Sequence, residues 1–319
     1  MARVLVVGAG ALGSVFGAFL RRAGDDVTLL GRPAHLEAIA AHALLVDGLW
    51  GEHRVSDLRL ATDWPRDDSP YDAVLVTVKS FDTTAVASHV GALVAPDGVV
   101  ISLQNGLGNV EALADAAGAD RVLGGRVIFG AALLAPGRVR VTVYADPVLI
   151  GTVRHGLAGL EERAAVWAAH VGAAGIPCEY CPDVLAALWG KVLYNAALNP
   201  LSALLGVHYG ALAEHPHTRA IMDAVIDEVV GVAHAEGISL PWATATEYRA
   251  VFYGRLVPST ARHRSSMLQD LERGRRTEID AINGAIWQRA LTRGMVAPFN
   301  EVLTRLVHVR EALGPGVEP

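Results

Sequence analysis

The chain has 319 residues, of which 52% are apolar and 19% are charged. This length is enough for two domains of ordinary size, and the composition is that of a well-packed globular protein rather than a disordered or fibrous one. The formal net charge of −6 provides no overall attraction to nucleic acid or to an anionic membrane. We therefore expect neither as a partner, and we expect local cations wherever an anionic ligand binds.

The first half of the chain alternates between strand and helix patterns. Short apolar runs rich in β-branched residues predict buried parallel strands, and an apolar periodicity that ends at Gly24 predicts a helix after the first strand. The predicted strands are residues 4–7, 27–30, 73–78 and 99–103, and the helix carries Leu12, Val15, Phe16, Phe19 and Leu20. Such alternation predicts an α/β fold in which helices cover a parallel sheet.

The pattern changes twice further along the chain. Residues 138–144, with Pro136-Gly137 as a turn, predict an antiparallel hairpin that closes the first domain. Helical periodicity follows from about Pro182. It covers residues 185–199, 219–236 and 278–293, with Gly237 and Gly294 at helix C-termini. Gly and Pro cluster at residues 175–182, so we expect a dinucleotide-binding domain at residues 1–180 and an all-helical substrate-binding and catalytic domain at residues 181–319.

The two cysteines, Cys178 and Cys181, have a C-x-x-C spacing. That spacing suits a redox pair or half of a zinc site. There is no second Cys pair and no His pair at metal-ligand spacing downstream, so we expect no bound metal. Two reduced thiols in a strand or linker of a cytosolic protein are the favoured interpretation.

No secretory signal is expected, because an apolar run at residues 4–7 follows the N-terminus at once and no cleavage site comes after it. The longest apolar stretch, residues 184–207, contains Lys191, Asn199 and Pro200, which disfavour a membrane span. We therefore expect a cytoplasmic protein.

A glycine-rich motif, Gly8-Ala9-Gly10-Ala11-Leu12-Gly13, directly follows the first predicted strand and opens the first predicted helix. This is the context that a G-x-G-x-x-G motif needs in order to bind a dinucleotide. The first glycine permits a tight turn, the second lets the backbone approach a pyrophosphate, and the third lets helix and strand pack closely. The N–H groups at the start of the helix then face the anion.

The residue after the second strand distinguishes NAD from NADP. An acidic residue there holds the ribose hydroxyls of NAD, whereas this chain has Gly31-Arg32, and a cation suits the 2′-phosphate of NADPH. His35 either assists or lies on the surface. Lys79 and Asn105 each follow a predicted parallel strand, where ligands of such sheets bind, so we expect both to line the ligand site.

One segment of the second half carries polar residues at helical spacing. Lys191, Asn195 and Asn199 are separated by four residues each, so they share one face of a helix whose other residues are nearly all apolar. Buried Lys and Asn are costly unless they are paired or functional. A partly buried Lys can protonate a carbonyl oxygen as hydride reaches the carbon, so Lys191 is the candidate general acid.

Two further candidates lie near the end of the chain. Ser266 with Gln269 fits a helix capping box, and a helix N-terminus also suits a substrate carboxylate, so either role or both are open. Glu278 is either a first-turn acid of a helix or a partner of Lys191 and the substrate hydroxyl.

Taken together, these motifs resemble the ketopantoate reductase (2-dehydropantoate 2-reductase) family over nearly the whole chain. The resemblance rests on the glycine motif, Arg32, Val78-Lys79, Gln104-Asn105-Gly106, the Lys191/Asn195/Asn199 helix, Ser266-Met267-Leu268-Gln269-Asp270 and Thr277-Glu278-Ile279-Asp280. It implies a Rossmann domain followed by a helical domain like those of 6-phosphogluconate dehydrogenases, with NADPH and a keto acid held in the cleft between the domains.

The same resemblance implies roles for individual residues. Lys191 would be the general acid and Glu278 would hold the substrate and the Lys network. Asn195, Asn199 and Ser266 would contact substrate, while Lys79 and Asn105 would lie along the cofactor and near the substrate. The chain departs from the family pattern at Tyr209 and His263, where family members often carry Asn or a small polar residue.

Three functions are consistent with these features. The first is NADPH-dependent reduction of ketopantoate to pantoate, on the route to coenzyme A. The second is reduction of another branched or aromatic 2-keto acid on the same scaffold. The third is a dinucleotide sensor without turnover, which the presence of Lys191 and its neighbours disfavours. The oligomeric state stays open, with a homodimer as one option.

Overall fold

We analysed a computed structural model of the chain, which describes residues 1–66, 70–154 and 156–314. The chain forms two compact units, each of which is built from its own internal contacts. The first unit comprises Met1–Gln104 and Asn109–Leu185, and the second comprises Asn105–Gly108 and Ala186–Pro319. The short segment 105–108 therefore belongs to the second unit although the first unit flanks it in sequence.

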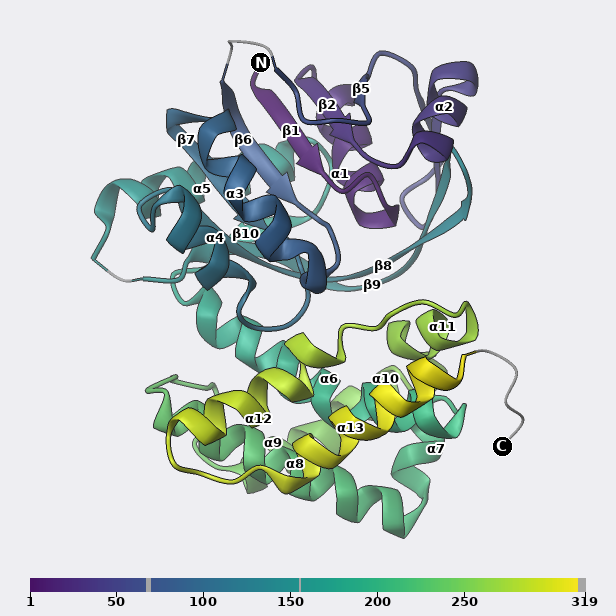
Figure 1. Cartoon of the computed structure of the whole chain (residues 1–319), viewed down its shortest axis with the longest axis vertical. Helices are drawn as coiled ribbons and strands as arrows, with labels where there is room; N and C mark the ends of the chain where they lie inside the picture. The colour runs from purple at the N-terminus through teal and green to yellow at the C-terminus, as the bar shows by residue number, and fades with distance from the viewer. Residues whose placement is uncertain (67–69, 155, 315–319) are drawn as a thin grey trace. The chain divides into compact units, whose positions relative to one another are not determined.

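The first unit is built on a mostly parallel sheet covered by helices (Figure 1). The parallel part has the strand order β5-β2-β1-β6-β7-β8, which is the 3-2-1-4-5-6 order of a dinucleotide-binding Rossmann sheet. Its strands are β1 (Arg3–Val7), β2 (Asp26–Leu30), β5 (Arg59–Ala61), β6 (Tyr71–Val76), β7 (Val94–Ser102) and β8 (Val122–Ala135). Its helices are α1 (Ala11–Arg22), α2 (Pro33–His42), α3 (Thr83–Leu93), α4 (Asn109–Ala117) and α5 (Ala158–Ala173). The predicted α/β fold is confirmed.

An antiparallel strand, β9 (Arg138–Thr152), pairs with β8 after the Pro136-Gly137 turn. The predicted hairpin is therefore confirmed. The sheet also continues beyond it through β3 (Leu44–Gly48) and β4 (His53–Val55), and β10 (Cys178–Tyr180) pairs with β9. Strands β3 and β4 were not predicted.

His35 lies at the junction of this hairpin with α2 and is 5% exposed. Its Nδ1 accepts a hydrogen bond from the backbone N–H of Gly137 at 3.0 Å, and its Nε2 lies 3.0 Å from Ser14 Oγ. Burial lowers the pKa of the imidazole. Neither predicted role, an aid to phosphate binding or a surface residue, is right, because both ring nitrogens hold structural elements together.

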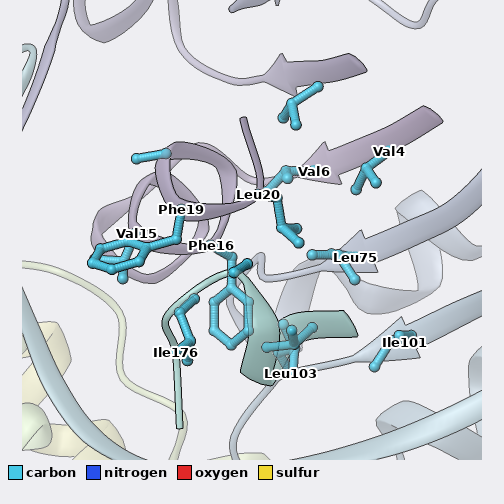
Figure 2. Close-up of a cluster of buried hydrophobic side chains, with 14 of the residues drawn as sticks. Val4, Val6, Val15, Phe16, Phe19, Leu20, Leu75, Ile101, Leu103 and Ile176 are labelled. Atoms are coloured by element: carbon cyan, nitrogen blue, oxygen red, sulfur yellow. The ribbon is translucent and has the colours of Figure 1, made fainter. Parts of the chain in front are cut away.

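The core of the first unit forms where α1 packs on the sheet (Figure 2). Apolar residues recur every three to four positions in α1, which places them on one face of the helix. That face contacts alternate side chains of the central strands. The cluster includes Val4, Val6, Val15, Phe16, Phe19, Leu20, Leu75, Ile101, Leu103 and Ile176.

In its described residues the second unit contains helices and turns. The helices are α6 (Val184–Leu205), which begins in the first unit, α7 (Tyr209–Glu214), α8 (Pro216–Ala235), α9 (Ala245–Val251), α10 (Val257–Ser259), α11 (Ser266–Glu272), α12 (Asn283–Thr292) and α13 (Pro298–Leu313). Gly237 and Gly294 have φ of +73° and +67° directly after the ends of α8 and α12, which confirms them as helix C-terminal glycines.

Within the described ranges, no helix is both long and apolar enough to cross a membrane. The two cysteines are unpaired thiols, and Cys178 lies in β10, as the strand interpretation predicts. Burial raises the pKa of the Cys178 thiol to about 12, which opposes the thiolate form that redox chemistry needs.

Candidate active site

The glycine motif forms the connection between β1 and α1, at the point where the strand order changes direction. Gly8 has φ +104°, a conformation that side chains disfavour, and a Cβ there would lie 2.7 Å from Val78 N. A Cβ at Gly13 would lie 2.3 Å from the carbonyl oxygen of Gly8. These two glycines are therefore required by the turn and by the close packing of the helix on the strand.

Gly10 differs from its neighbours because the space around it is open. It is exposed, and the nearest atom to a Cβ placed on it would be 4.0 Å away. The first intrahelical bond runs from Ser14 N to Gly10 O at 2.9 Å, so the three N–H groups of Ala11, Leu12 and Gly13 precede the first helical donor. This start of α1 can accommodate a pyrophosphate against oriented N–H groups.

Two cations lie at the carboxyl ends of β2 and β6, the strands on either side of β1. Arg32 is exposed at the cap position of α2, directly after β2, and no other residue in the described ranges forms a hydrogen bond or ion pair with its guanidinium. Lys79 is half-buried just after β6, where it precedes a 3-10 turn at Ser80–Asp82. Arg32 is thus available to an anion, as the sequence predicts.

In the second unit, a chain of polar contacts joins three of the predicted residues. Lys191 Nζ donates to Asn105 Oδ1 at 2.5 Å, and Asn105 Nδ2 donates to Glu278 Oε2 at 3.1 Å. Glu278 is 7% exposed, whereas Lys191 and Asn105 are half-buried. Because an ionised carboxylate can only accept, Glu278 faces the amide nitrogen of Asn105 and leaves the amide oxygen for the lysine.

The segment that carries Asn105 is fixed beside a short 3-10 turn, Ile279–Ala281. Leu107 N donates to Ala281 O at 2.8 Å. Gly106 has φ +86°, and a Cβ on it would lie only 2.4 Å from the same carbonyl oxygen. A glycine is therefore needed next to Asn105 for the segment to reach this turn.

The structure corrects the local setting of two predicted residues. Ser265, not Ser266, caps α11, because its Oγ accepts from Leu268 N at 3.0 Å, while Ser266 is the first helical residue and is exposed. Glu278 is not a first-turn acid, because α12 begins five residues later, at Asn283. Its other predicted role, as a partner in the Lys191 network, matches the contact through Asn105.

The polar face of α6 becomes more buried toward its C-terminal end. Asn195 is half-buried and Asn199 is 3% exposed. The hydroxyl of Tyr209, also 3% exposed, donates to Asn199 Oδ1 at 2.5 Å. The ring of His263 lies 5.2 Å from that of Tyr209, and burial lowers the pKa of its imidazole. The two residues that depart from the family pattern therefore lie beside each other, and Tyr209 contacts Asn199.

Pro200 lies inside α6 and has no N–H, so the carbonyl of Ala196 loses its helical partner. Asn283 replaces that partner: its Nδ2 lies 3.0 Å from Ala196 O and 3.0 Å from Asn300 Oδ1. Asn283 and Asn300 are fully buried. Sequence reasoning missed Asn283, although a proline within a helix signals that a donor must come from elsewhere.

Lysine is rare in this chain. Of its 27 Lys and Arg residues, only Lys79 and Lys191 are lysines. Arginine supplies charge but keeps its proton, whereas lysine can release one. A lysine at position 191, in a chain whose other Lys and Arg residues are all arginine except Lys79, fits a role that requires proton release. This count was a further signal in the sequence.

The fold and the site define a dinucleotide-binding protein of the reductase type, with a Rossmann unit and a helical unit that carries a Lys–amide–carboxylate chain. The family model for "Ketopantoate reductase PanE/ApbA" matches residues 4–157, and that for its C-terminal part matches residues 183–311. The chain belongs to the ketopantoate reductase family.

Individual relatives agree along the whole chain. The 2-dehydropantoate 2-reductase of Aquifex aeolicus is 39% identical over 311 residues, which cover 97% of each protein. The crystal structure of a PanE/ApbA family ketopantoate reductase from Ralstonia eutropha has a TM-score of 0.85 at 35% identity, and the match covers 98% of this chain and 99% of that one. A D-mandelate dehydrogenase with NADH and anilino(oxo)acetate has a TM-score of 0.88 at 26% identity, with 98% of both chains covered.

Proposed function

We propose that this protein reduces 2-dehydropantoate (ketopantoate) to pantoate with NADPH, as a cytoplasmic step of pantothenate and coenzyme A biosynthesis. The observation that carries the proposal is the Lys191–Asn105–Glu278 chain of hydrogen bonds, which holds the Lys191 ammonium in place and so supports a role as proton donor to a ketone. The full-length similarity to 2-dehydropantoate 2-reductases supports the choice of substrate.

The cofactor, when bound, supplies a hydride to C2 of the keto acid. Negative charge then develops on the former ketone oxygen, and Lys191 supplies the proton that neutralises it. Asn105 orients the ammonium through its amide oxygen, and Glu278 keeps that amide from turning over. In the proposal, Asn195, Asn199 and Ser266 bind the remaining polar groups of the substrate.

The first unit fits a dinucleotide in two respects. The open space at Gly10 and the leading N–H groups of α1 suit a pyrophosphate, and Gly8, Ala9, Leu12 and Gly13 shape that turn. The exposed guanidinium of Arg32 suits the 2′-phosphate that distinguishes NADPH from NADH. Lys79 is a further proposed cofactor contact of this unit, and Asn105, a residue of the second unit, is proposed as another.

Arg32→Ala is expected to raise KM for NADPH by about tenfold to a hundredfold, because a charge-assisted contact of this kind is worth about 1.5–3 kcal/mol. KM for NADH should change little. Arg22→Ala, which removes an exposed arginine at the end of α1, serves as the matched control. Equal use of NADPH and NADH by the unmodified enzyme would overturn the NADPH assignment.

A second candidate substrate is an aromatic 2-keto acid. The similarity to a D-mandelate dehydrogenase, which acts on an aromatic hydroxy acid, favours it, as do the neighbouring rings of Tyr209 and His263. That relative was solved with NADH, so the same comparison also bears on the choice of cofactor.

Comparison of kcat/KM for ketopantoate, pyruvate and phenylglyoxylate with NADPH separates these candidates. Ketopantoate is expected to exceed pyruvate by about tenfold, since its two methyl groups bury more apolar surface at about 0.8 kcal/mol per carbon. A higher value for phenylglyoxylate than for ketopantoate would replace the first candidate with the second. NADPH binding without turnover of any 2-keto acid would identify a sensor instead.

A further inference from the structure

The turn that carries Glu278 is short and irregular. Glu278 precedes the 3-10 turn Ile279–Ala281, and α12 begins only at Asn283. Few helical hydrogen bonds can hold such a segment, so contacts from outside it decide where the Glu278 carboxylate lies.

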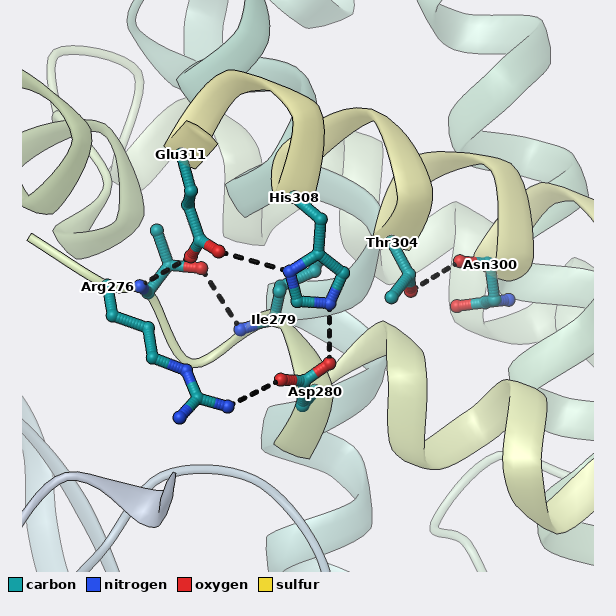
Figure 3. A network of polar contacts seen from close by, with 8 residues as sticks. Arg276, Ile279, Asp280, Asn300, Thr304, His308 and Glu311 are labelled. Atoms are coloured by element: carbon teal, nitrogen blue, oxygen red, sulfur yellow. Dashed lines mark hydrogen bonds and ion pairs between the residues drawn. The ribbon is translucent and has the colours of Figure 1, made fainter. Parts of the chain in front are cut away.

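Helix α13 supplies these contacts through His308 and Glu311, which face Asp280 and the chain beside it (Figure 3). Before Glu278, Thr277 N donates to Glu311 Oε1 at 2.6 Å. After it, the Asp280 carboxylate lies 2.7 Å from His308 Nε2, and His308 Nδ1 lies 3.0 Å from Glu311 Oε2. The imidazole thus links a carboxylate of the turn to a carboxylate of the helix.

The geometry requires a charged imidazole. Both ring nitrogens of His308 face carboxylate oxygens, and an ionised carboxylate can only accept, so both nitrogens must carry a proton. Burial lowers the pKa of His308, but the hydrogen bonds to Glu311 and Asp280 outweigh it, so the pKa is raised above 6.5. Arg276 Nη2 lies 3.1 Å from Asp280 Oδ2, so a further charged group contacts this cluster.

The same turn also holds the segment of Asn105, the residue that links Glu278 to Lys191 by hydrogen bonds. Ala281 O accepts from Leu107 N at 2.8 Å, two residues beyond Asn105. A shift of the turn would therefore move both Asn105 and Glu278, which together orient Lys191.

We propose that His308 is a positioning residue for the reaction: through Asp280 and Glu311 its imidazolium holds the 277–281 turn, and thereby keeps Glu278 and Asn105 aligned on Lys191. This inference rests on the proposed function. Below pH 6.5 the imidazolium donates to both Asp280 and Glu311. One of these two contacts is lost as the pH rises through the raised pKa of His308, because the neutral ring can donate to only one carboxylate.

The test compares His308→Gln with wild type across pH. Displacement of a catalytic group by a fraction of an ångström lowers turnover, so below pH 6.5 we expect kcat to fall by about threefold to tenfold, with KM for NADPH unchanged. The difference should vanish at a pH well above the midpoint of His308. His234→Gln, the same change at an exposed histidine of α8, should have no effect at any pH. The proposal would be overturned if kcat of wild type and His308→Gln were equal at every pH, or if they differed by a factor that did not change with pH.

Nuclear magnetic resonance supplies a readout that does not depend on turnover. The side-chain amide signals of Asn105 should shift with pH at the midpoint of the His308 ring, and this shift should be absent in His308→Gln. If wild type reduces no 2-keto acid, the proposed function fails, and these signals still decide whether His308 controls the position of Asn105. Amide signals that do not follow the His308 titration refute the positioning role.

Discussion

Replacement of Lys191 with Ala is expected to lower kcat by about a hundredfold to ten-thousandfold, the usual contribution of positioned general-acid catalysis. KM for NADPH should change little, because the glycine motif and Arg32 lie in the other unit. The fold should persist, since the half-buried side chain of Lys191 leaves no large cavity when it is truncated. Single-turnover oxidation of NADPH with the preferred keto acid measures the effect.

Lys191→Arg is the matched variant, because it keeps the charge and much of the length. A guanidinium holds its proton too tightly to release it, so this variant should also be slow if proton donation is the role. A variant with arginine that retains nearly full kcat would show that charge alone suffices. A folded Lys191→Ala protein with nearly full kcat would show that another group, or water, supplies the proton.

The pH dependence provides a second check on the same residue. The reductive rate should fall at high pH as the Lys191 ammonium deprotonates. This decrease at high pH should be absent from the pH–rate profile of Lys191→Ala. The scarcity of lysine makes the titration directly visible. Reductive ¹³C-methylation should give only two lysine signals, from Lys79 and Lys191, and the alanine variant assigns them.

The fold was predictable because its main elements are strongly patterned. The alternation around residues 4–7 and 27–30, with the glycine motif between them, indicated the Rossmann sheet that the structure confirms. Strands β3 (LLVDG) and β4 (HRV) were not predicted, because polar residues interrupt both and neither contains an apolar run longer than Leu44–Val46. The start of α12 was placed too early, since apolar spacing continues through the preceding 3-10 turn.

The site was predictable as a set of residues but not as a set of contacts. The spacing of Lys191, Asn195 and Asn199 identified one helix face, and the strand ends identified Lys79 and Asn105 as separate candidates. The contact between Lys191 and Asn105 joins residues 86 positions apart, which no local pattern reveals. The cap of α11 was predicted at Ser266 and is found at Ser265 for a similar reason, because only the backbone geometry decides between adjacent serines.

Asn283→Leu, which keeps the approximate shape of the side chain, is expected to lower the free energy of unfolding of the second unit by about 2–4 kcal/mol. The change leaves two buried acceptors, Ala196 O and Asn300 Oδ1, without this donor, and each buried polar group so deprived costs about 1–3 kcal/mol. The change also removes Asn283 Oδ1, a buried oxygen that has no hydrogen-bond partner among the described residues. Removal of this unpaired oxygen is favourable and offsets part of that cost. Urea unfolding followed by helix circular dichroism measures the difference.

The structural reason for the effect is testable with Pro200→Ala. Alanine restores an N–H at position 200, which can donate to Ala196 O within α6, so the Asn283 amide is no longer the only donor for that carbonyl. The double variant should therefore be more stable than the sum of the two single effects predicts, by about 1 kcal/mol or more.

Pro216→Ala is the control, because Pro216 is the first residue of α8, where no helical bond is missing. Its effect should simply add to that of Asn283→Leu. Additivity with Pro200→Ala as well would mean that Asn283 stabilises the unit by packing rather than by replacing the lost helical donor.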